Sequence, residues 1–251
     1  MVHFVGAGCG AADLITLRGK ALLEKADIII YAGSLVNPQL LDYAGENCAI
    51  HNSAYMDLDQ VIEVMEKAEA RGLVTVRLHT GDPSVYGAIR EQMDRLDQLK
   101  IEYDVCPGVS SFCGAAAALR AEYTLPDVSQ TVIITRMAGR TPVPARESIE
   151  TLAAHGSTMV IFLSTGLLEE LSKSLIQGGY SPETPAAIVY KASWEDEKVC
   201  RCTVSSLKET AEANNITKTA LITVGGFLGD DYSLSKLYDK TFETEFRKLC
   251  Q

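Results

Sequence analysis

Residues 2–11, VHFVGAGCGA, are a short apolar run that ends in a cluster of glycines. The run Val2–Val5 is typical of a buried strand, and glycines directly after a strand let the backbone turn sharply and approach a ligand closely. Similar runs follow at 27–31 and 73–78, and helical spacing of apolar residues lies between them at 57–71. Strands that alternate with helices in this way predict a mainly parallel sheet covered by helices.

The second half of the chain continues the alternation, but less regularly. A lapse of pattern at 121–129 predicts a linker, so we expect two α/β domains, residues 1–123 and 124–251, the second with a mixed sheet. The polar turn ASWEDE (192–197) predicts a hairpin. The expected strands are 130–136, 158–163, 186–190, 198–203 and 219–224, and the expected helices are 147–155, 167–177 and 206–214, the last opened by a capping box of Ser206 and Glu209.

The composition is that of an acidic globular protein. Lys and Arg number 23 against 33 Asp and Glu, which gives a net charge of −10, and 47% of the residues are apolar. This balance excludes wholesale disorder and argues against a general nucleic-acid binder. No apolar run reaches the roughly 18 residues of a membrane helix, and no cationic leader opens the chain. Seven cysteines without metal-ligand spacing and four scattered histidines predict a reduced, cytoplasmic chain with no protein-bound metal.

Three loops follow predicted strands and open toward helices. The glycine loop at 6–11 is the first, HTGDPSVYG (79–87) is the second, and PGVSSF (107–112), after an expected strand at 101–105, is the third. Because the carboxyl ends of parallel strands meet at one edge of a sheet, where ligands of α/β proteins bind, the three loops together predict one binding crevice. The alternative for the second loop is purely structural, with Asp82 as an N-cap and Pro83 as the first helical residue.

The glycine loop also satisfies the dinucleotide pattern G-x-G-x-x-A, so an NAD(P)-binding oxidoreductase is a competing hypothesis. That fold needs a helix that starts at the glycines and an acidic residue at the end of the second strand. Here the helical pattern begins near Thr16, and Asp27 lies at the wrong end of the strand. A tight turn with no ligand is the third alternative, since single glycine motifs are weak signals.

An arginine-rich loop follows the first strand of the second half. Arg136, Arg140 and Arg146 surround the stiff segment TPVP (141–144). Guanidinium groups recognise carboxylates and phosphates through paired hydrogen bonds, so this loop is the candidate site for an anionic substrate. The alternative is a solvated loop with scattered charge.

Five of these segments, in this order, resemble the tetrapyrrole (corrin) methyltransferases that use S-adenosylmethionine. They are VGAGCGAADLITLRG, DIIIYAGSLV, HTGDPSVYGAI, PGVSSF and RMAGRTPVP. The resemblance covers essentially the whole chain. The segments YAGSLV, RMAGRTPVP, YKASWEDEK and LYDKTFETEFRK are similar to the branch that methylates cobalt-precorrin-4 at ring carbon 11 in the anaerobic route of cobalamin biosynthesis. The alternative is methylation of metal-free precorrin-4 in the aerobic route.

The resemblance implies a cofactor, S-adenosylmethionine, in the cleft between two α/β domains, a homodimer and a tetrapyrrole substrate, with neither nucleic acid nor membrane as a partner. The cofactor contacts that it implies are Cys9, Thr80, Gly81, Asp82, Val85, Ser110, Ser111, Leu163, Ala192 and Ala220. The substrate contacts would be Arg136, Arg140 and Arg146.

Two departures from the family pattern matter. The family usually has Pro where this chain has Cys9, and the related uroporphyrinogen methylases carry an acid where this chain has Ala32. The second departure argues against uroporphyrinogen as the substrate and leaves no general base to assign. The expected reaction is an in-line displacement, in which alignment and desolvation supply most of the catalysis.

Overall fold

The computed structural model describes residues 1–247, and its contacts group the chain into two compact units. The first unit comprises residues 1–115 together with 191–197, and the second comprises 116–190 and the chain from 198 onward. Both units are α/β, as predicted. The boundary predicted between residues 123 and 124 remains a prediction. Cys250 and the end of the LYDKTFETEFRK segment, Lys248, lie outside the described residues.

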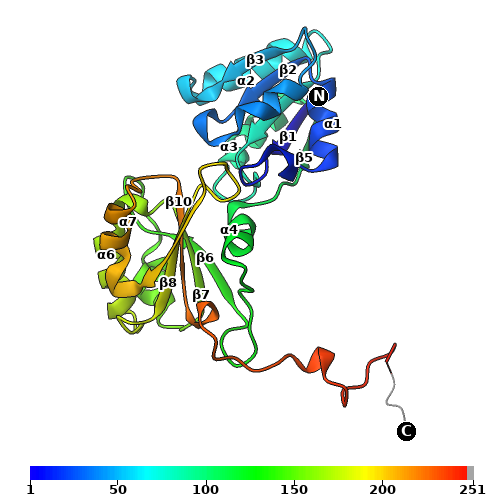
Figure 1. The fold of residues 1–251 in the computed structure, drawn as a ribbon. Helices are drawn as coiled ribbons and strands as arrows, with labels where there is room; N and C mark the ends of the chain where they lie inside the picture. The colour runs from blue at the N-terminus through cyan, green and yellow to red at the C-terminus, as the bar shows by residue number, and fades with distance from the viewer. Residues whose placement is uncertain (248–251) are drawn as a thin grey trace. The chain divides into compact units, whose positions relative to one another are not determined.

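The first unit is built on a parallel sheet with the order β3-β2-β4-β1-β5 (Figure 1). This confirms the prediction from the alternating pattern. The alternating pattern does not reveal β3, a short edge strand whose first two residues are exposed. The strands are β1 (Val2–Gly6), β2 (Ile28–Tyr31), β3 (Ala49–Asn52), β4 (Thr75–His79) and β5 (Tyr103–Cys106).

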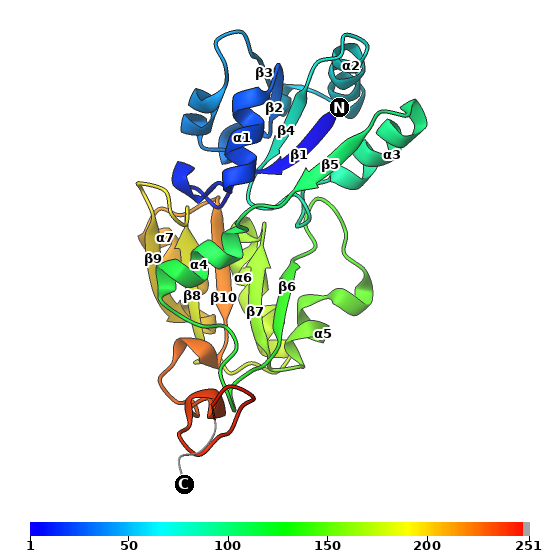
Figure 2. The ribbon, with the colours of Figure 1, turned by 90° about the vertical axis from the view of Figure 1, so that its right-hand side faces the viewer.

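Helices cover both faces of this sheet (Figure 2). Successive strand residues point to opposite faces, so Val5 packs with Leu23 of α1 (Leu17–Lys25), whereas Phe4 lies in the core formed with α2 (Leu58–Glu69) and α3 (Ile89–Leu99). Because both faces are covered, the inner strand β2 is apolar and β1 nearly so. Because the packed sheet holds its strands in place, the loops at the strand ends have defined positions.

The second unit has a mixed sheet with the order β6-β7-β10-β8-β9. Only β6 and β7 are parallel, and the predicted hairpin of β8 and β9 is confirmed as an antiparallel pair. The helices α5, α6 and α7 pack into one apolar core with the strands (Figure 1). The elements are β6 (Val132–Arg136), α5 (Ile149–Ala153), β7 (Thr158–Phe162), α6 (Leu168–Gln177), β8 (Pro185–Tyr190), β9 (Lys198–Thr203), α7 (Leu207–Ala213) and β10 (Ala220–Val224), while α4 (Ser111–Leu119) crosses the boundary between the units.

Short 3-10 turns connect many of these elements. They are η1 (Ala12–Leu14), η2 (Gly33–Leu35), η3 (Pro38–Tyr43), η4 (Ser53–Tyr55), η5 (Ala145–Glu147), η6 (Thr165–Leu167), η7 (Val204–Ser206), η8 (Gly226–Leu228) and η9 (Lys236–Tyr238). Within residues 1–247, no helix has the length and apolar character needed to cross a membrane.

One capping prediction was wrong, and the structural alternative for the second loop is not found. The predicted box of Ser206 and Glu209 does not form, because the Ser206 hydroxyl instead accepts the backbone N–H of Thr203 and completes a box with that residue. Asp82 does not cap a helix either. The helix α3 begins only at Ile89, after Ala88, whose φ of 50° is left-handed. Residues 82–88 therefore form a loop of their own.

Candidate functional site

The three predicted loops meet at one edge of the first sheet. They follow β1, β4 and β5, which are neighbours in that sheet. The backbone N–H of Ala7 donates to the carbonyl of His79 at 2.7 Å, and Gly8 and Gly81 exchange two backbone hydrogen bonds of 3.2 and 2.9 Å. The first two loops are thus joined by their backbones, at the edge where ligands of α/β proteins bind.

Glycines let the third loop join the other two. A Cβ atom placed on Gly108 would lie 2.2 Å from the carbonyl oxygen of Gly81 and 2.7 Å from the Cα of Gly6. A Cβ on Gly6 would lie 2.5 Å from the Cα of Gly108. Gly81 also has a φ of 62°, which side chains rarely adopt. The three loops therefore touch through backbone atoms, and no side chain fits between them.

Asp82 ties the second loop to the third. One carboxylate oxygen accepts the backbone N–H of Ser84 at 2.9 Å and the Ser84 hydroxyl, and the other accepts the N–H of Gly108 at 2.8 Å. Partial burial raises the pKa of Asp82, but the hydrogen bonds from Ser84 and Gly108 outweigh it, so that its pKa lies below the usual value. The carboxylate is therefore ionised at neutral pH.

A buried polar chain supports the second loop from inside the unit. The Arg77 guanidinium donates to the carbonyl of Ile30 and to the side-chain oxygen of Gln92, both at 3.1 Å, and the Gln92 amide donates to the carbonyl of Ala88 at 3.0 Å. Burial lowers the pKa of Arg77 to about 10, so it remains charged. This chain holds Ala88 in its left-handed conformation. In the sequence, the one sign of this buried polar chain is the charged residue Arg77 within the apolar run 73–78, and it was not recognised as such.

His79 is buried beside Arg77 at the end of β4. Its Nε2 atom has no hydrogen-bond partner among the described residues. Burial, and then the positive charge of Arg77, lower the pKa of His79 to about 3. The side chain is therefore neutral at physiological pH, and its role at this edge is to pack against Phe4.

A fourth segment, residues 191–197, lies against the glycine loop. It joins β8 to β9 but belongs to the first unit. The Ser193 hydroxyl accepts the backbone N–H of Ala11 at 3.0 Å and lies 3.4 Å from the Cys9 sulfur. Gly114 has both Cys9 and Ala192 as near neighbours. Two predicted cofactor contacts, Cys9 and Ala192, are thus brought together.

The other predicted cofactor positions of the first unit lie on the second and third loops. Thr80 and Val85 are half-buried, Ser110 is buried, and Ser111 is the first residue of α4. The structure therefore gathers every first-unit position of the prediction on these joined loops and residues 191–197. Their role in binding the cofactor remains a prediction.

Three predicted positions of the second unit lie at one edge of its sheet. Arg136 ends β6 and pairs with Phe162 of β7, Leu163 follows β7, and Ala220 opens β10 with its carbonyl accepting the Thr165 hydroxyl at 3.2 Å. Leu163 is 68% exposed and has a φ of 53°, an unusual combination for an apolar residue. The roles of Leu163 and Ala220 also remain predictions.

Ser164 holds this edge of the second sheet together. It is fully buried, accepts the backbone N–H of Met137 at 3.0 Å and donates to the carbonyl of Phe162 at 2.7 Å. One hydroxyl thus connects the end of β7 with the start of the arginine-rich loop. No motif in the sequence marks this residue.

The three arginines of the predicted substrate loop behave differently. Arg136 donates to the carbonyls of Met137, Thr141 and Pro142 at 3.1, 3.2 and 2.8 Å. Arg140 is exposed, and no hydrogen bond or ion pair joins it to another residue of the described chain. Arg146 lies 3.7 Å from Glu147. The three guanidinium groups share no partner within residues 1–247, and their substrate-binding role remains a prediction.

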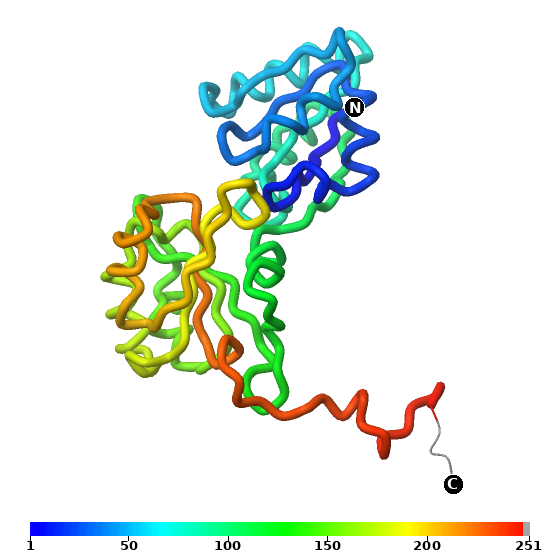
Figure 3. The backbone as a smooth tube through the Cα atoms, in the orientation of Figure 1, coloured from blue at the N-terminus to red at the C-terminus, as the bar shows by residue number. Residues whose placement is uncertain are grey.

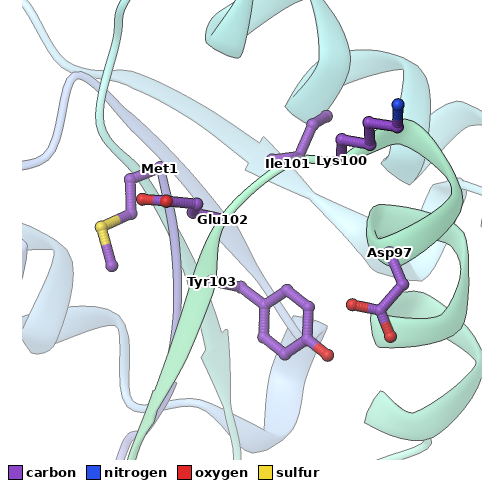
Figure 4. A pocket seen from close by; sticks show the side chains of 6 residues that line it. All are labelled: Met1, Asp97, Lys100, Ile101, Glu102 and Tyr103. Carbon is purple, nitrogen blue, oxygen red and sulfur yellow. The ribbon is translucent and has the colours of Figure 1, made fainter.

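A hollow in the first unit lies away from these loops (Figure 4). It is lined by Met1 before β1, by residues 100–103 at the start of β5 and by Asp97, toward which the Tyr103 hydroxyl points. These are the amino ends of the strands, opposite the edge where α/β proteins bind ligands. We therefore assign the site to the loops. Within residues 1–247, no three His, Cys, Asp or Glu side chains are grouped to hold a metal ion.

Comparisons with known proteins agree with this arrangement. A family model described as tetrapyrrole (corrin/porphyrin) methylases matches residues 1–208. The cobalt-precorrin-4 C(11)-methyltransferase of Methanocaldococcus jannaschii is 54% identical over 98% of this chain and 96% of its own. The precorrin-4 C(11)-methyltransferase of Sinorhizobium sp. is 44% identical over 98% of each.

A solved structure supports the same assignment. The X-ray structure of a cobalamin biosynthetic enzyme, cobalt precorrin-4 methyltransferase CbiF, superimposes with a TM-score of 0.89 at 43% identity and covers 91% of this chain and 96% of that one. Its similarity extends over both units. Because the family model spans most of the chain and the relatives match nearly end to end, this chain belongs to the tetrapyrrole (corrin/porphyrin) methylases.

Proposed function

We propose that this chain transfers a methyl group from S-adenosylmethionine to ring carbon 11 of cobalt-precorrin-4, in the anaerobic route of cobalamin biosynthesis. The observation that carries the proposal is the meeting of the loops after β1, β4 and β5, with backbone contacts that exclude side chains. The relative at 54% identity supports the cobalt-containing substrate. The Sinorhizobium relative makes metal-free precorrin-4 the second candidate.

The joined loops fit the proposed cofactor. Glycine leaves backbone groups open to a ligand, and the Asp82 carboxylate is ionised and held by the loop backbones. When bound, S-adenosylmethionine would supply a methyl group on a positively charged sulfur. Residues Cys9, Gly81, Ser110 and Ala192 would hold it. A negative charge at Asp82 favours a cationic ligand over an anionic one.

The chain's contribution to the reaction is then position and exclusion of water. Alignment of two reacting groups can lower a barrier by up to about 7–11 kcal/mol, so no conspicuous acid or base is required. The buried chain from Arg77 to Ala88 and the bond from Asp82 to Gly108 hold the loops rigidly. Rigid loops preserve that alignment from one turnover to the next.

The competing NAD(P) hypothesis lacks its structural requirement. The first α-helix begins at Leu17, well after the glycines, and the N–H of Gly19 in its first turn is occupied by the Thr16 hydroxyl at 3.0 Å. The glycine loop is followed by the three-residue 3-10 turn η1 and not by the α-helix whose N-terminus would receive a pyrophosphate.

Titration calorimetry with S-adenosylhomocysteine, with NAD and NADP as controls, tests the proposal. We expect saturable one-site binding of S-adenosylhomocysteine and no binding of either nicotinamide nucleotide. Methyl transfer to cobalt-precorrin-4 and to metal-free precorrin-4 then distinguishes the two substrates. Tight binding of NAD or NADP, with no heat from S-adenosylhomocysteine, would overturn the proposal.

The remaining assignments belong to the same proposal. Arg136, Arg140 and Arg146 would contact substrate carboxylates, a role for which guanidinium groups are suited. A homodimer is supported by the family resemblance, and a cytoplasmic location by the six free cysteines among residues 1–247.

A further inference from the structure

We propose that residues 191–197, here called the strap, position the glycine loop for cofactor binding, and that Ser193 is the residue through which they act. The inference rests on the proposed function and adds a positioning element to the same site. In Figure 3 the strap (yellow) lies beside the first loop (dark blue), although more than half of the chain separates them. The family resemblance includes Ala192 of the strap among the cofactor contacts but gives Ser193 no role.

The strap and the glycine loop are fitted to each other. A Cβ atom on Gly10 would lie 2.3 Å from the Cδ1 of Trp194 and 2.5 Å from the carbonyl oxygen of Ala192. Gly10 is therefore a glycine because the strap occupies the space that a side chain would need. The tryptophan side chain lies on the loop backbone at this point.

Ser193 adds polar contacts to this packing. Its hydroxyl accepts the N–H of Ala11 at 3.0 Å and lies 3.4 Å from the sulfur of Cys9. The residue before Ser193 is Ala192 and the residue before Ala11 is Gly10, so one hydroxyl joins the two segments where they touch. Without this hydroxyl, the N–H of Ala11 would lose its hydrogen-bond partner. The end of the glycine loop, and Cys9 within it, would then no longer be held against the strap.

The strap is itself rigid. Ser193 donates its N–H to the Glu197 carboxylate at 2.6 Å, and Lys191 pairs with Asp196 at 2.6 Å while lying 5.4 Å from the centre of the Trp194 ring. Lys191 and Ser193 both have left-handed backbones, with φ of 47° and 66°. Such conformations are uncommon for residues other than glycine and are maintained by the surrounding contacts. The strap thus presents a fixed surface to the loop.

Trp194 gives a direct readout, because it is the single tryptophan of the chain. Its fluorescence reports on the strap alone. If the strap belongs to the cofactor site, S-adenosylhomocysteine changes the Trp194 emission, and the change saturates at the dissociation constant that calorimetry gives. A strap with a purely structural role would leave the emission unaltered at saturating ligand.

Two substitutions test the hydroxyl itself. Ser193→Ala removes it, and Ser193→Gly removes it while accepting the left-handed backbone without strain. We expect both to weaken S-adenosylhomocysteine binding about three- to tenfold, the effect of one partly buried hydrogen bond. In turnover, the KM for S-adenosylmethionine should rise by the same factor while kcat changes little. The matched control is Ser181→Ala, since Ser181 accepts the N–H of Glu183 at 3.2 Å in the second unit.

The outcomes separate the two proposals. If the unmodified chain binds S-adenosylhomocysteine but both Ser193 variants bind it as tightly, or its emission does not respond, the strap proposal is overturned and the proposed function stands. If the unmodified chain fails to bind S-adenosylhomocysteine, the proposed function falls first. Ser181→Ala should bind within about twofold of the unmodified chain.

Discussion

The two sheets carry their loops at edges that are built by different means. At the edge of the first sheet, Gly6, Gly81 and Gly108 meet through backbone atoms, and the contacts leave no room for a Cβ on Gly6 or Gly108. At the edge of the second sheet, side chains make the connections, chiefly the Ser164 hydroxyl and the Arg136 guanidinium. Where backbone atoms touch directly, an added Cβ would force the loops apart. Where side chains make the contacts, a substitution removes single hydrogen bonds and should cost less stability.

The polar groups inside the two units differ as well. The first unit buries Arg77 and His79 on one strand. The second buries only hydroxyl side chains: Thr135, Thr158, Ser164 and Thr223 are its fully or nearly fully buried polar residues among those described. Hydroxyl groups do not titrate near neutral pH, so acid should affect the two units unequally.

Gly108→Ala should have the largest effect and breaks the backbone edge directly. The added Cβ would lie 2.2 Å from the Gly81 oxygen, and backbone atoms held by paired hydrogen bonds cannot move aside cheaply. We expect a loss of about 3 kcal/mol or more in the free energy of unfolding. Denaturant unfolding measures the loss, and calorimetry should show that S-adenosylhomocysteine no longer binds.

The matched control is Gly45→Ala in the same unit. No atom lies within 4 Å of a Cβ at Gly45, so this change should alter stability by less than about 0.5 kcal/mol. Equal stability of the Gly108 and Gly45 variants would show that the loops can part without cost. The contrast between a backbone edge and a side-chain edge would then be lost.

This difference also explains what could be predicted from the sequence. Glycines after apolar runs point to a backbone site, because few other roles require the absence of a side chain at such places. The three loops and the parallel sheet were therefore predictable. Ser164 was not, because a buried serine that joins two strand ends looks like any other serine in the sequence.

Contacts between distant parts of the chain were the other limit. ASWEDE was correctly predicted as a hairpin turn, but local polarity says nothing about docking on a loop some 180 residues earlier. Competing hydrogen-bond partners, one distant and one local, explain the two helix caps that do not form. Asp82 is bound to the distant Gly108, and the Ser206 hydroxyl is engaged by Thr203 instead of capping with Glu209. In each case another partner prevailed over the local motif.

Replacement of His79 should give the next largest effect, a change in how stability depends on pH. It tests whether the buried titratable group of the first unit makes that unit more sensitive to acid than the second. Its pKa in the folded protein is about 3, against 6.5 for an ordinary histidine. The unfolded chain therefore takes up a proton that the folded chain refuses. Stability from this group is fully present above pH 6.5 and is lost as the pH falls toward 3. The loss should be about 3 kcal/mol between pH 7 and pH 4.

His79→Leu should remove this component of acid sensitivity. At pH 7 the change should cost less than about 1 kcal/mol, because Nε2 has no partner to lose within the described chain. Denaturant unfolding of both proteins from pH 7 to pH 4 measures the difference. The control is His155→Gln at an exposed position of the second unit, which should keep the original pH dependence. Parallel stability profiles for His79→Leu and the unmodified chain would contradict the prediction.

The smallest effects on stability are expected at the arginine-rich loop. Comparison of variants at Arg136 and Arg140 distinguishes a role in loop structure from a role in substrate contact. Arg136→Ala removes hydrogen bonds to three carbonyls, so we expect a loss of about 1 kcal/mol in unfolding free energy. Arg140→Ala removes no bond to a described residue and should change stability by less than about 0.5 kcal/mol.

Both arginine variants should weaken tetrapyrrole binding and spare the affinity for S-adenosylhomocysteine. Because Arg140 is exposed and its guanidinium has no partner within residues 1–247, its effect on tetrapyrrole binding would report a direct contact. Arg136 is engaged by its own loop, so its effect would come through the shape of that loop. Unfolding curves and calorimetry with both ligands distinguish these roles. Unchanged tetrapyrrole affinity in both variants would remove the arginine-rich loop from the substrate site.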